Sequence, residues 1–347
     1  MTHPELTDRE RRVLEAVIQS YVETAEPAGS RTLSRRFGLG VSPATIRNTM
    51  SDLEEKGFLF HPHTSAGRVP TDKAYRVYVD SLMRLAPMTV SERKRLADQI
   101  AGGGSAIATI LRRAAQSLGI LTQELGVALG PRLDDAVLQR LELVRLSADR
   151  LLIVLTLDRG VPRTIFVELE GEIADNAVAE VSAVLNDRLA GLPLREIRSS
   201  LAARLRDSAP SSNATELLNV FVQDGEQYFD VSYVAADAGV VLGHASLLAD
   251  QPEFASGESM RRLIQLTETR EHLGELLRKR SETPGITITI GNEHDDPRLE
   301  NFTVVTAEYH AGSLTGVIGV IGPTRMPYDK VISLVSHTSR LVTELLE

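Results

Sequence analysis

A short helix, a tight glycine turn and a second, capped helix follow one another near the N-terminus, and no other feature of the chain constrains the fold as strongly. Ser30 is expected to cap the short helix, and Leu33 and Phe37 are expected to point inward, because residues four apart share a helix face. Gly38 and Gly40 then supply the turn. The series predicts two helices held close together at the start of the chain.

A longer helix is predicted just before this series. Thr7 can cap it, and Glu10 three residues on completes a capping box. Apolar residues follow at helical spacing, namely Val13, Leu14, Val17, Ile18 and Tyr21. This helix is expected to provide the surface on which the other two pack.

The second helix of the series sorts its residues cleanly by face. Ser42 caps it, and Pro43 occupies its first position, where proline is favoured. The inward positions are Ile46, Met50 and Leu53, and the outward positions are Ala44, Arg47, Asn48 and Ser51. The outward set contains no acid, which suits a helix that enters the major groove of DNA. An ordinary amphipathic helix with a solvated outer face is the alternative.

Acidic residues enter this helix only in its second half, at Asp52, Glu54 and Glu55. Their charges oppose the helix dipole there and repel phosphate. We therefore expect the N-terminal half of the helix to be the end that meets DNA.

A β-hairpin is predicted directly after that helix. Phe58–Phe60 and Arg68–Pro70 form its strands, joined by a polar loop. A hairpin in this position is a wing, and Arg68 at its tip is expected to reach phosphate or an adjacent minor groove. His61 and His63 leave a metal site open, but no further histidine or cysteine lies nearby, so the polar loop is favoured.

The net charge of −9 is unevenly distributed along the chain. Residues 1–84 hold 12 basic and 11 acidic side chains, whereas the remainder hold 26 and 36. Within the first part, the stretch 27–51 contains four arginines and no acid. A local basic face on an acidic protein fits a small DNA-reading domain attached to a regulatory body.

Four segments resemble those of one bacterial family. Segments 42–48 (SPATIRN) and 63–73 (HTSAGRVPTDK) look like signatures of HrcA, the heat-inducible repressor of chaperone genes. Segments 185–192 (LNDRLAGL) and 321–328 (IGPTRMPY) look like its mid-chain and C-terminal motifs. The resemblance covers nearly the whole chain and departs at Thr49, where an acidic residue is expected.

This resemblance implies a repressor that binds double-stranded DNA as a homodimer, at an inverted-repeat operator of the CIRCE type upstream of chaperone operons. It further implies that a GroEL-type chaperonin supports the activity. The implied fold class is α+β and multidomain, with an N-terminal winged helix-turn-helix, a GAF-like antiparallel-sheet domain and an inserted α/β dimerising domain. The expected bounds are 1–85 for the winged-helix domain, 86–105 for a linker, 106–212 and 281–347 for the GAF-like domain, and 213–280 for the insertion.

Strand-like runs in the rest of the chain agree with an interrupted sheet. They cover Leu141–Leu146, Leu151–Leu157 and Thr164–Leu169 early in the chain, and Ile286–Ile290, Phe302–Tyr309 and Thr315–Ile321 late in it. Helices are expected over about 106–125 and over Tyr328–Leu346. We expect one sheet built from both groups of strands. Pairing over such a separation is slow, which gives a physical reason for dependence on a chaperonin.

No set of residues with catalytic chemistry stands out in this part. Gly316, Gly319 and Gly322 lack the lysine and the serine or threonine of a phosphate-binding loop, so a tightly packed strand is favoured. We recognise no nucleophile–base pair, cofactor motif or metal-ligand cluster, and therefore expect neither an enzyme nor a cofactor. A regulator whose GAF-like domain binds a small effector and an enzyme with a DNA-binding appendage are the competing interpretations.

The expected DNA-binding residues lie on the two helices of the series and in the wing. They are Arg31, Arg35, Ser42, Ala44, Thr45, Arg47, Asn48, Ser51, His63, Thr64 and Arg68. The chain has no cysteine, no apolar run long enough to span a membrane and no secretory signal at its start. We therefore expect a cytoplasmic protein that does not bind a membrane.

Overall fold

The computed structural model describes most of the chain and divides it into two compact units. The described residues are 6–62, 67–102, 107–131, 133–134, 136–158, 162–169, 174–206, 208, 212–229, 239–281, 283–312 and 314–347. The first unit comprises Met1–Gly130, Val240–Tyr309 and Val317–Leu346. The second comprises Pro131–Gly239 and His310–Gly316.

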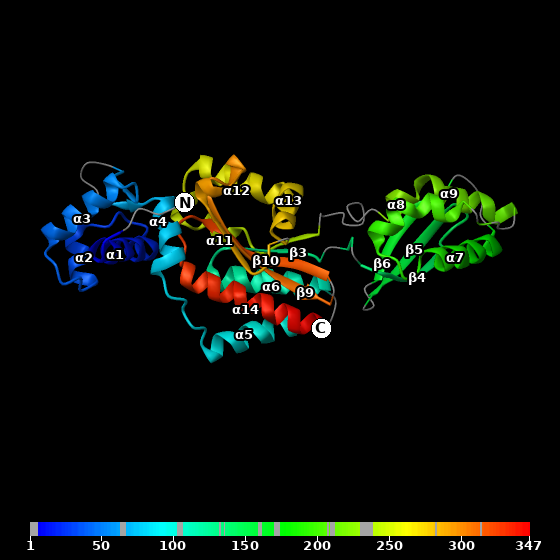
Figure 1. The fold of residues 1–347 in the computed structure, drawn as a ribbon, viewed down its shortest axis with the longest axis horizontal. Coiled ribbons are helices and arrows are strands. Elements are labelled where there is room, and N and C mark those ends of the chain that lie inside the picture. The colour runs from blue at the N-terminus through cyan, green and yellow to red at the C-terminus, as the bar shows by residue number, and fades with distance from the viewer. Residues whose placement is uncertain are drawn as a thin grey trace. The chain divides into compact units, whose positions relative to one another are not determined.

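The first unit begins with the predicted helices and hairpin, which we call the N-terminal module (Figure 1). Its elements are α1 (Asp8–Thr24), α2 (Ser30–Arg36), α3 (Pro43–Glu55), β1 (Leu59–Phe60) and β2 (Val69–Pro70). Thr7 and Glu10 form the expected capping box, and the antiparallel pairing of Leu59 with Pro70 confirms the hairpin. The cap of α2 is Gly29 rather than Ser30.

The rest of the first unit, after the hairpin, is called the body. A connecting stretch leads into it and consists of α4 (Asp72–Val77), the π-helical turn η1 (Tyr78–Leu82) and α5 (Val90–Ala101). The predicted linker over 86–105 thus contains a helix, and Leu96 and Ile100 of this helix are fully buried. Because α5 contacts α6 (Ile107–Thr122) and α14 (Tyr328–Leu346), it is part of the packed body.

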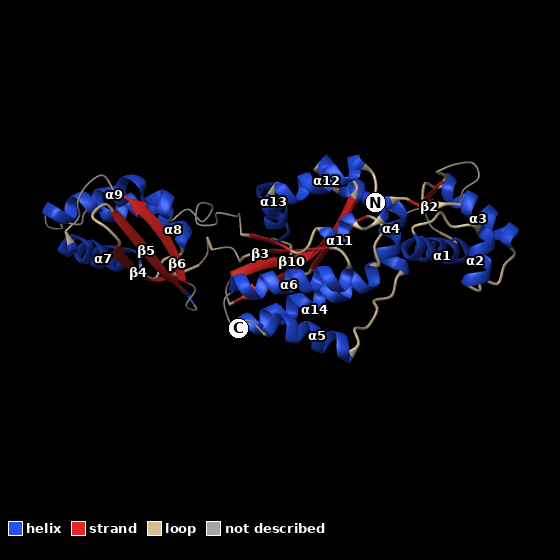
Figure 2. Cartoon of the chain, turned by 180° about the vertical axis from the view of Figure 1, so that it is seen from behind, coloured by secondary structure: helices blue, strands red, loops and turns tan. Residues whose placement is uncertain are grey.

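A five-stranded sheet forms the centre of the body, in the order β7-β3-β10-β9-β8. Its strands are β3 (Leu125–Leu129), β7 (Val240–Leu242), β8 (Ile286–Ile290), β9 (Phe302–Ala311) and β10 (Leu314–Pro323). In Figures 1 and 2, α6 and α14 lie on one side of the sheet, and α12 (Gly257–Glu268) and α13 (Arg270–Ser281) lie on the other. Shorter elements are α11 (Ser246–Ala249), η3 (Pro252–Phe254), η4 (Gly291–Glu293) and η5 (Pro297–Leu299).

The second unit is a three-stranded antiparallel sheet packed against helices. Its strands run in the order β4 (Leu138–Arg145), β5 (Arg150–Leu157), β6 (Pro162–Glu168). The helices are α7 (Asp175–Leu189), α8 (Leu194–Leu205) and α9 (Ser212–Tyr228). Alternate strand residues such as Ile153 and Leu155 join Val181 and Phe221 in a separate hydrophobic core.

The expectation of one sheet built from early and late strands is wrong. All six predicted strands exist, but β4, β5 and β6 pair only with one another. Of the late strands, β10 pairs instead with β3, where no strand was predicted and whose first residue, Leu125, was expected to end a helix. A run of five apolar residues cannot be distinguished from a helix by its periodicity. Gln123, with a left-handed φ of 63°, ends the helix before it.

The glycine repeat of β10 is a packing feature, as the sequence indicated. A Cβ atom at Gly319 would lie 2.1 Å from the carbonyl oxygen of Val305 on the neighbouring strand. A Cβ atom at Gly322 would lie 2.0 Å from a carboxylate oxygen of Glu124, whose burial raises its pKa well above the ordinary value. The glycines therefore allow the close approach of neighbouring groups.

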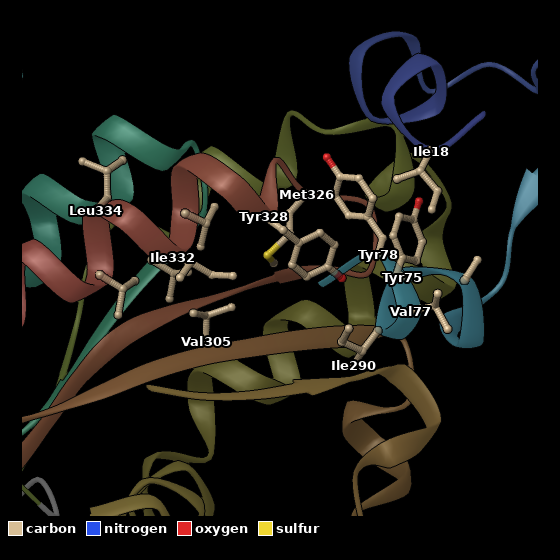
Figure 3. Packing of buried hydrophobic residues seen from close by; sticks show 14 of the residues in the cluster. Ile18, Tyr75, Val77, Tyr78, Ile290, Val305, Met326, Tyr328, Ile332 and Leu334 are labelled. Carbon is tan, nitrogen blue, oxygen red and sulfur yellow. The ribbon is translucent and has the colours of Figure 1, made fainter. Parts of the chain in front are cut away.

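One hydrophobic core runs from the N-terminal module into the body. Figure 3 shows Ile18 of α1 near Tyr75 and Tyr78, with Tyr328 of α14 beyond them. The rings of Tyr75 and Tyr328 lie 5.6 Å apart, centroid to centroid. In the part of the chain that the structure describes, no helix has both the length and the apolar character needed to cross a membrane.

Candidate nucleic-acid interface

The outward face of α3 is exposed, and its N-terminal half, up to Ser51, carries no acidic side chain. Ala44, Arg47 and Asn48 are all exposed, whereas Ile46 and Leu53 on the opposite side are fully buried. Among the described residues, no carboxylate forms an ion pair with Arg47 and no side chain bonds to Asn48. Both side chains can therefore reach an external partner.

The first turn of α3 is held by local hydrogen bonds. Ser42 Oγ accepts from the Thr45 backbone N–H at 3.1 Å, as expected of the cap. Thr49, the departure from the expected pattern, is 2% exposed, and its hydroxyl donates to the Thr45 carbonyl at 3.1 Å. Ser51 is half-buried and donates to the Arg47 carbonyl at 3.3 Å. Thr49 thus belongs to the inner face of α3.

Cations of α2 extend this face. Arg31 and Arg35 are exposed, and no carboxylate in the described part of the chain pairs with them. Arg36, which was not included in the expected set, is engaged in an ion pair with Glu23 of α1. Unpaired guanidinium groups beside the acid-free N-terminal half of α3 create a local positive potential that attracts phosphate.

Arg68 lies at the root of the hairpin and is engaged within the protein. Its Nη2 lies 2.7 Å from Glu54 Oε2 on α3, and its side chain is 17% exposed. Its backbone exchanges hydrogen bonds of 2.8 and 3.0 Å with Ala28. A Cβ atom at Gly67 would lie 2.3 Å from the Ala28 carbonyl oxygen, so only glycine fits beside this bridge. The expectation of a free Arg68 at the tip is corrected: it joins hairpin and α3.

Two of the expected DNA-binding residues, His63 and Thr64, lie outside the described residues, as does most of the predicted wing loop. His61 is half-buried. Among the described residues, no group of three or more histidine and acidic side chains is arranged to hold a metal ion.

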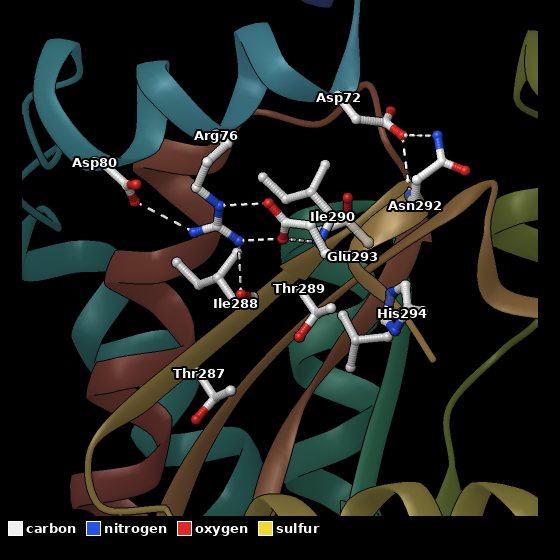
Figure 4. A network of polar contacts seen from close by, with 12 residues as sticks. Asp72, Arg76, Asp80, Thr287, Ile288, Thr289, Ile290, Asn292, Glu293 and His294 are labelled. Atoms are coloured by element: carbon white, nitrogen blue, oxygen red, sulfur yellow. Dashed lines mark hydrogen bonds and ion pairs between the residues drawn. The ribbon is translucent and has the colours of Figure 1, made fainter. Parts of the chain in front are cut away.

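A polar clamp, which sequence reasoning missed, fastens α4 to the body (Figure 4). Arg76 binds Glu293 through two hydrogen bonds and donates to the Ile288 carbonyl of the edge strand β8 at 2.8 Å. Asp72 accepts from the backbone N–H and side-chain amide of Asn292 at 3.0 and 2.9 Å. Burial opposes ionisation of Glu293, but its hydrogen bonds from Arg76 and Ile290 lower its pKa below the ordinary value.

A second link joins α1 to the body. Arg325 donates to the Val22 carbonyl near the end of α1 at 2.7 Å and forms an ion pair with Glu253. Together with the clamp, this contact fixes where α3 faces relative to the sheet of the body. No sequence signal identifies these pairs, because their members lie more than 70 residues apart in the chain.

Comparisons with known proteins agree on one family. The family model described as the HrcA protein C-terminal domain matches residues 108–332. Heat-inducible transcription repressor HrcA of Chlorobium phaeobacteroides (strain BS1) is 40% identical and covers 97% of each chain. The repressor of the same name from Geobacter sulfurreducens is 37% identical over 99% of each chain. A crystal structure described as that of a hypothetical protein shares the fold, with a TM-score of 0.59, 23% identity and 99% coverage of both chains.

Proposed function

The chain belongs to the HrcA family of heat-inducible transcription repressors, which are not enzymes, and we propose that it binds an inverted-repeat operator of the CIRCE type as a homodimer and represses chaperone operons. In this proposal the N-terminal module is a winged helix whose α3 enters the major groove. The protein acts on DNA in the cytoplasm.

The exposed face of the N-terminal half of α3, which carries no acid from Ala44 to Ser51, is the observation that supports this proposal best. Arg47 and Asn48 lie side by side on it with no partner among the described residues. The guanidinium group of arginine forms bidentate contacts with guanine edges, and the amide group of asparagine forms them with adenine edges. Ala44 and Thr45 are short enough to let the helix approach the bases, and the Ser42 cap leaves the helix start facing the groove.

The remaining residues of the proposed interface have supporting roles. Arg31 and Arg35 neutralise phosphates, and Ser51 lies one turn beyond Arg47 on the same face. In this proposal, His63 and Thr64 of the wing loop contact the sugar-phosphate backbone of the DNA. We propose that Arg68 acts through its ion pair with Glu54, which orients the wing against α3.

The proposed dimer uses the second unit. We propose this unit, in place of the expected range 213–280, as the inserted dimerising domain within a GAF-like body. One face of its sheet packs on the helices, and the other carries an apolar row: Val144, Leu152 and Phe166 lie directly across from one another on the three strands. Val144 is 42% exposed and Phe166 is 74% exposed. Apolar side chains gathered on a sheet face are typical of a protein–protein contact.

Charges beside this row make the face suited to a second copy of itself. Arg140 pairs with Glu142 at 2.8 Å, and Arg150 pairs with Glu168 at 3.0 Å, all on the same face. Each cation is matched by an acid, so two identical faces do not repel each other. A two-fold interface between identical patches also matches the symmetry of an inverted repeat.

Placing a charge in the apolar row is expected to separate the dimer. Phe166→Asp should leave the unit folded, because Phe166 is largely exposed, but should shift sedimentation at micromolar concentration toward monomer. Operator affinity should fall by about 10²-fold or more, since the second half-site no longer binds at high effective concentration. Ser199→Asp, on an exposed position of α8, is the control and should change neither quantity. A Phe166→Asp variant that stays dimeric with full affinity would place the interface elsewhere.

We propose that supply of folded repressor links activity to the GroEL-type chaperonin. The pairing of β3 with β10 joins residues 125–129 to residues 317–321, and the whole second unit lies between these segments in the sequence. Until that pairing forms, apolar strands remain exposed, and the chain can aggregate. When heat fills the chaperonin with other clients, less repressor folds and chaperone genes are released.

Control by a small effector is the second candidate. A cavity of about 240 Å³ lies between the α12–α13 corner and η5, with Leu266, Leu273 and Leu299 in its lining. Such a cavity can hold a small molecule. Two results together would favour this candidate. Operator affinity would change when cellular small molecules are added, and the presence of chaperonin during folding would have no effect on it.

A further inference from the structure

Arg280, near the end of α13, carries a charge into the core of the body. It is 8% exposed and lies over the sheet between α13 and strands β8 and β9. Its Nη2 donates to Thr289 Oγ1 at 2.5 Å. Its Nη1 lies 3.4 Å from the Val304 carbonyl and 3.4 Å from Thr306 Oγ1, which are long contacts. Its Nε is buried and has no partner among the described residues.

No acid compensates this cation within the described part of the chain. Every hydrogen-bond partner of Arg280 is a neutral hydroxyl or carbonyl oxygen. Burial lowers the pKa of Arg280 to about 10 and is the only contributing cause. A buried guanidinium is costly unless it is paired with an anion, and proteins keep such groups mainly where they are used.

The surroundings of Arg280 offer hydrogen-bond donors to a negatively charged group. Thr287 and Thr289 of β8 are half-buried, and Thr306 lies directly across from Thr287 on β9. Figure 4 shows Thr287, Thr289 and His294 on the side of β8 that faces away from α4. Burial lowers the pKa of His294, and the charge of Arg280 lowers it further.

We propose that Arg280, with the hydroxyls of Thr289 and Thr306, binds the oxyanion of a small molecule carrying a phosphate or carboxylate group. The unpaired Nε and the loosely held Nη1 supply the donors that the anion uses, and the threonine hydroxyls rotate to donate to it. This site is distinct from the face of α3 and does not depend on DNA binding.

A purely structural role is the competing explanation. Arg280 is in the last turn of α13, where the helix dipole favours a cation. Arg278 and Lys279 in the same turn satisfy that preference from exposed positions. A structural arginine stabilises the protein without ligand, whereas a binding arginine stabilises it only when the anion is present.

Thermal unfolding of the full chain tests the site with inorganic phosphate and with acetate, each compared with chloride at equal ionic strength. For the wild type we expect a saturable rise in the unfolding midpoint, of about 5 °C at 100 times the dissociation constant, with at least one of the two anions. A rise with phosphate but not with acetate identifies a phosphate site, and a rise with acetate but not with phosphate identifies a carboxylate site. Lys279→Met, one residue away and exposed, should keep the rise.

Arg280→Met should abolish the rise in the unfolding midpoint. The anion-free midpoint of this variant should equal or exceed that of the wild type, because methionine has a similar volume and removes a buried, unpaired charge. If Arg280→Met does not fold, Thr289→Val supplies the second test and should reduce the rise. A linear, unsaturable increase shared by wild type, Lys279→Met and Arg280→Met overturns the proposal. So does a lower anion-free midpoint of Arg280→Met combined with no saturable rise in the wild type, since that is the behaviour of a structural cation.

Discussion

Asn48→Ala is expected to abolish most of the discrimination between operator and unrelated DNA. Asn48 is exposed on α3 and bonds to no side chain in the described part of the protein, so its amide is free to bind the edge of an adenine. A good bidentate contact contributes about 1–3 kcal/mol of discrimination. Two copies on an inverted repeat double this to about 2–6 kcal/mol, or about 30-fold to 10⁴-fold in operator affinity.

The measurement is a binding titration of the variant on operator and on a scrambled duplex at one salt concentration. Affinity for the scrambled duplex should hardly change, because Asn48 carries no charge. Arg95→Ala, which removes an exposed cation of α5 outside the proposed interface, is the control and should leave both affinities at the wild-type value. Equal losses on both duplexes would assign Asn48 to the phosphate backbone and contradict base reading by α3.

Refolding without chaperonin is expected to give several-fold less active repressor than refolding with chaperonin and ATP. The central strand β10 pairs with β3 although the second unit and α12–α13 lie between them in the chain. Until that pairing forms, β3, whose five residues are all buried in the folded protein, lacks its neighbour β10. Long-range pairing of this kind is slow and exposes chains to aggregation.

Denatured protein diluted into buffer with operator DNA gives the yield of binding-competent chain directly. Chaperonin without ATP is the control, and it should hold the chain without releasing active repressor. The yield gap should widen as the temperature rises, because aggregation competes better with slow pairing. Equal recovery with and without chaperonin across physiological temperatures would contradict control by folding supply and would favour the small-effector candidate.

Local signals were sufficient to predict the N-terminal module and the last helix. Thr7 and Ser42 mark the starts of α1 and α3 through caps that involve only the next three residues. The inner face of α3 follows from helical spacing alone, and α14 begins and ends where its apolar pattern does. Such elements are predictable because every contact that defines them is close in sequence.

Contacts between distant residues escaped prediction. The partners of β4 and β10 depend on pairing choices that an apolar run does not encode. The pairs Arg68–Glu54 and Arg76–Glu293 depend on how helices and strands are placed in space. Arg68 was therefore assigned to a free position at the wing tip, although the fold holds it against α3.

Binding of the full-length protein to three duplexes tests the central claim most directly: a symmetric inverted repeat, the same repeat with one arm scrambled, and a fully scrambled duplex. If α3 of two copies reads both arms, the intact repeat should bind about 10³-fold or more tightly than the scrambled duplex at physiological salt. The one-armed duplex should lie between them, and two chains should bind each intact repeat. Affinities that agree within a few-fold on all three duplexes would contradict sequence reading by this protein.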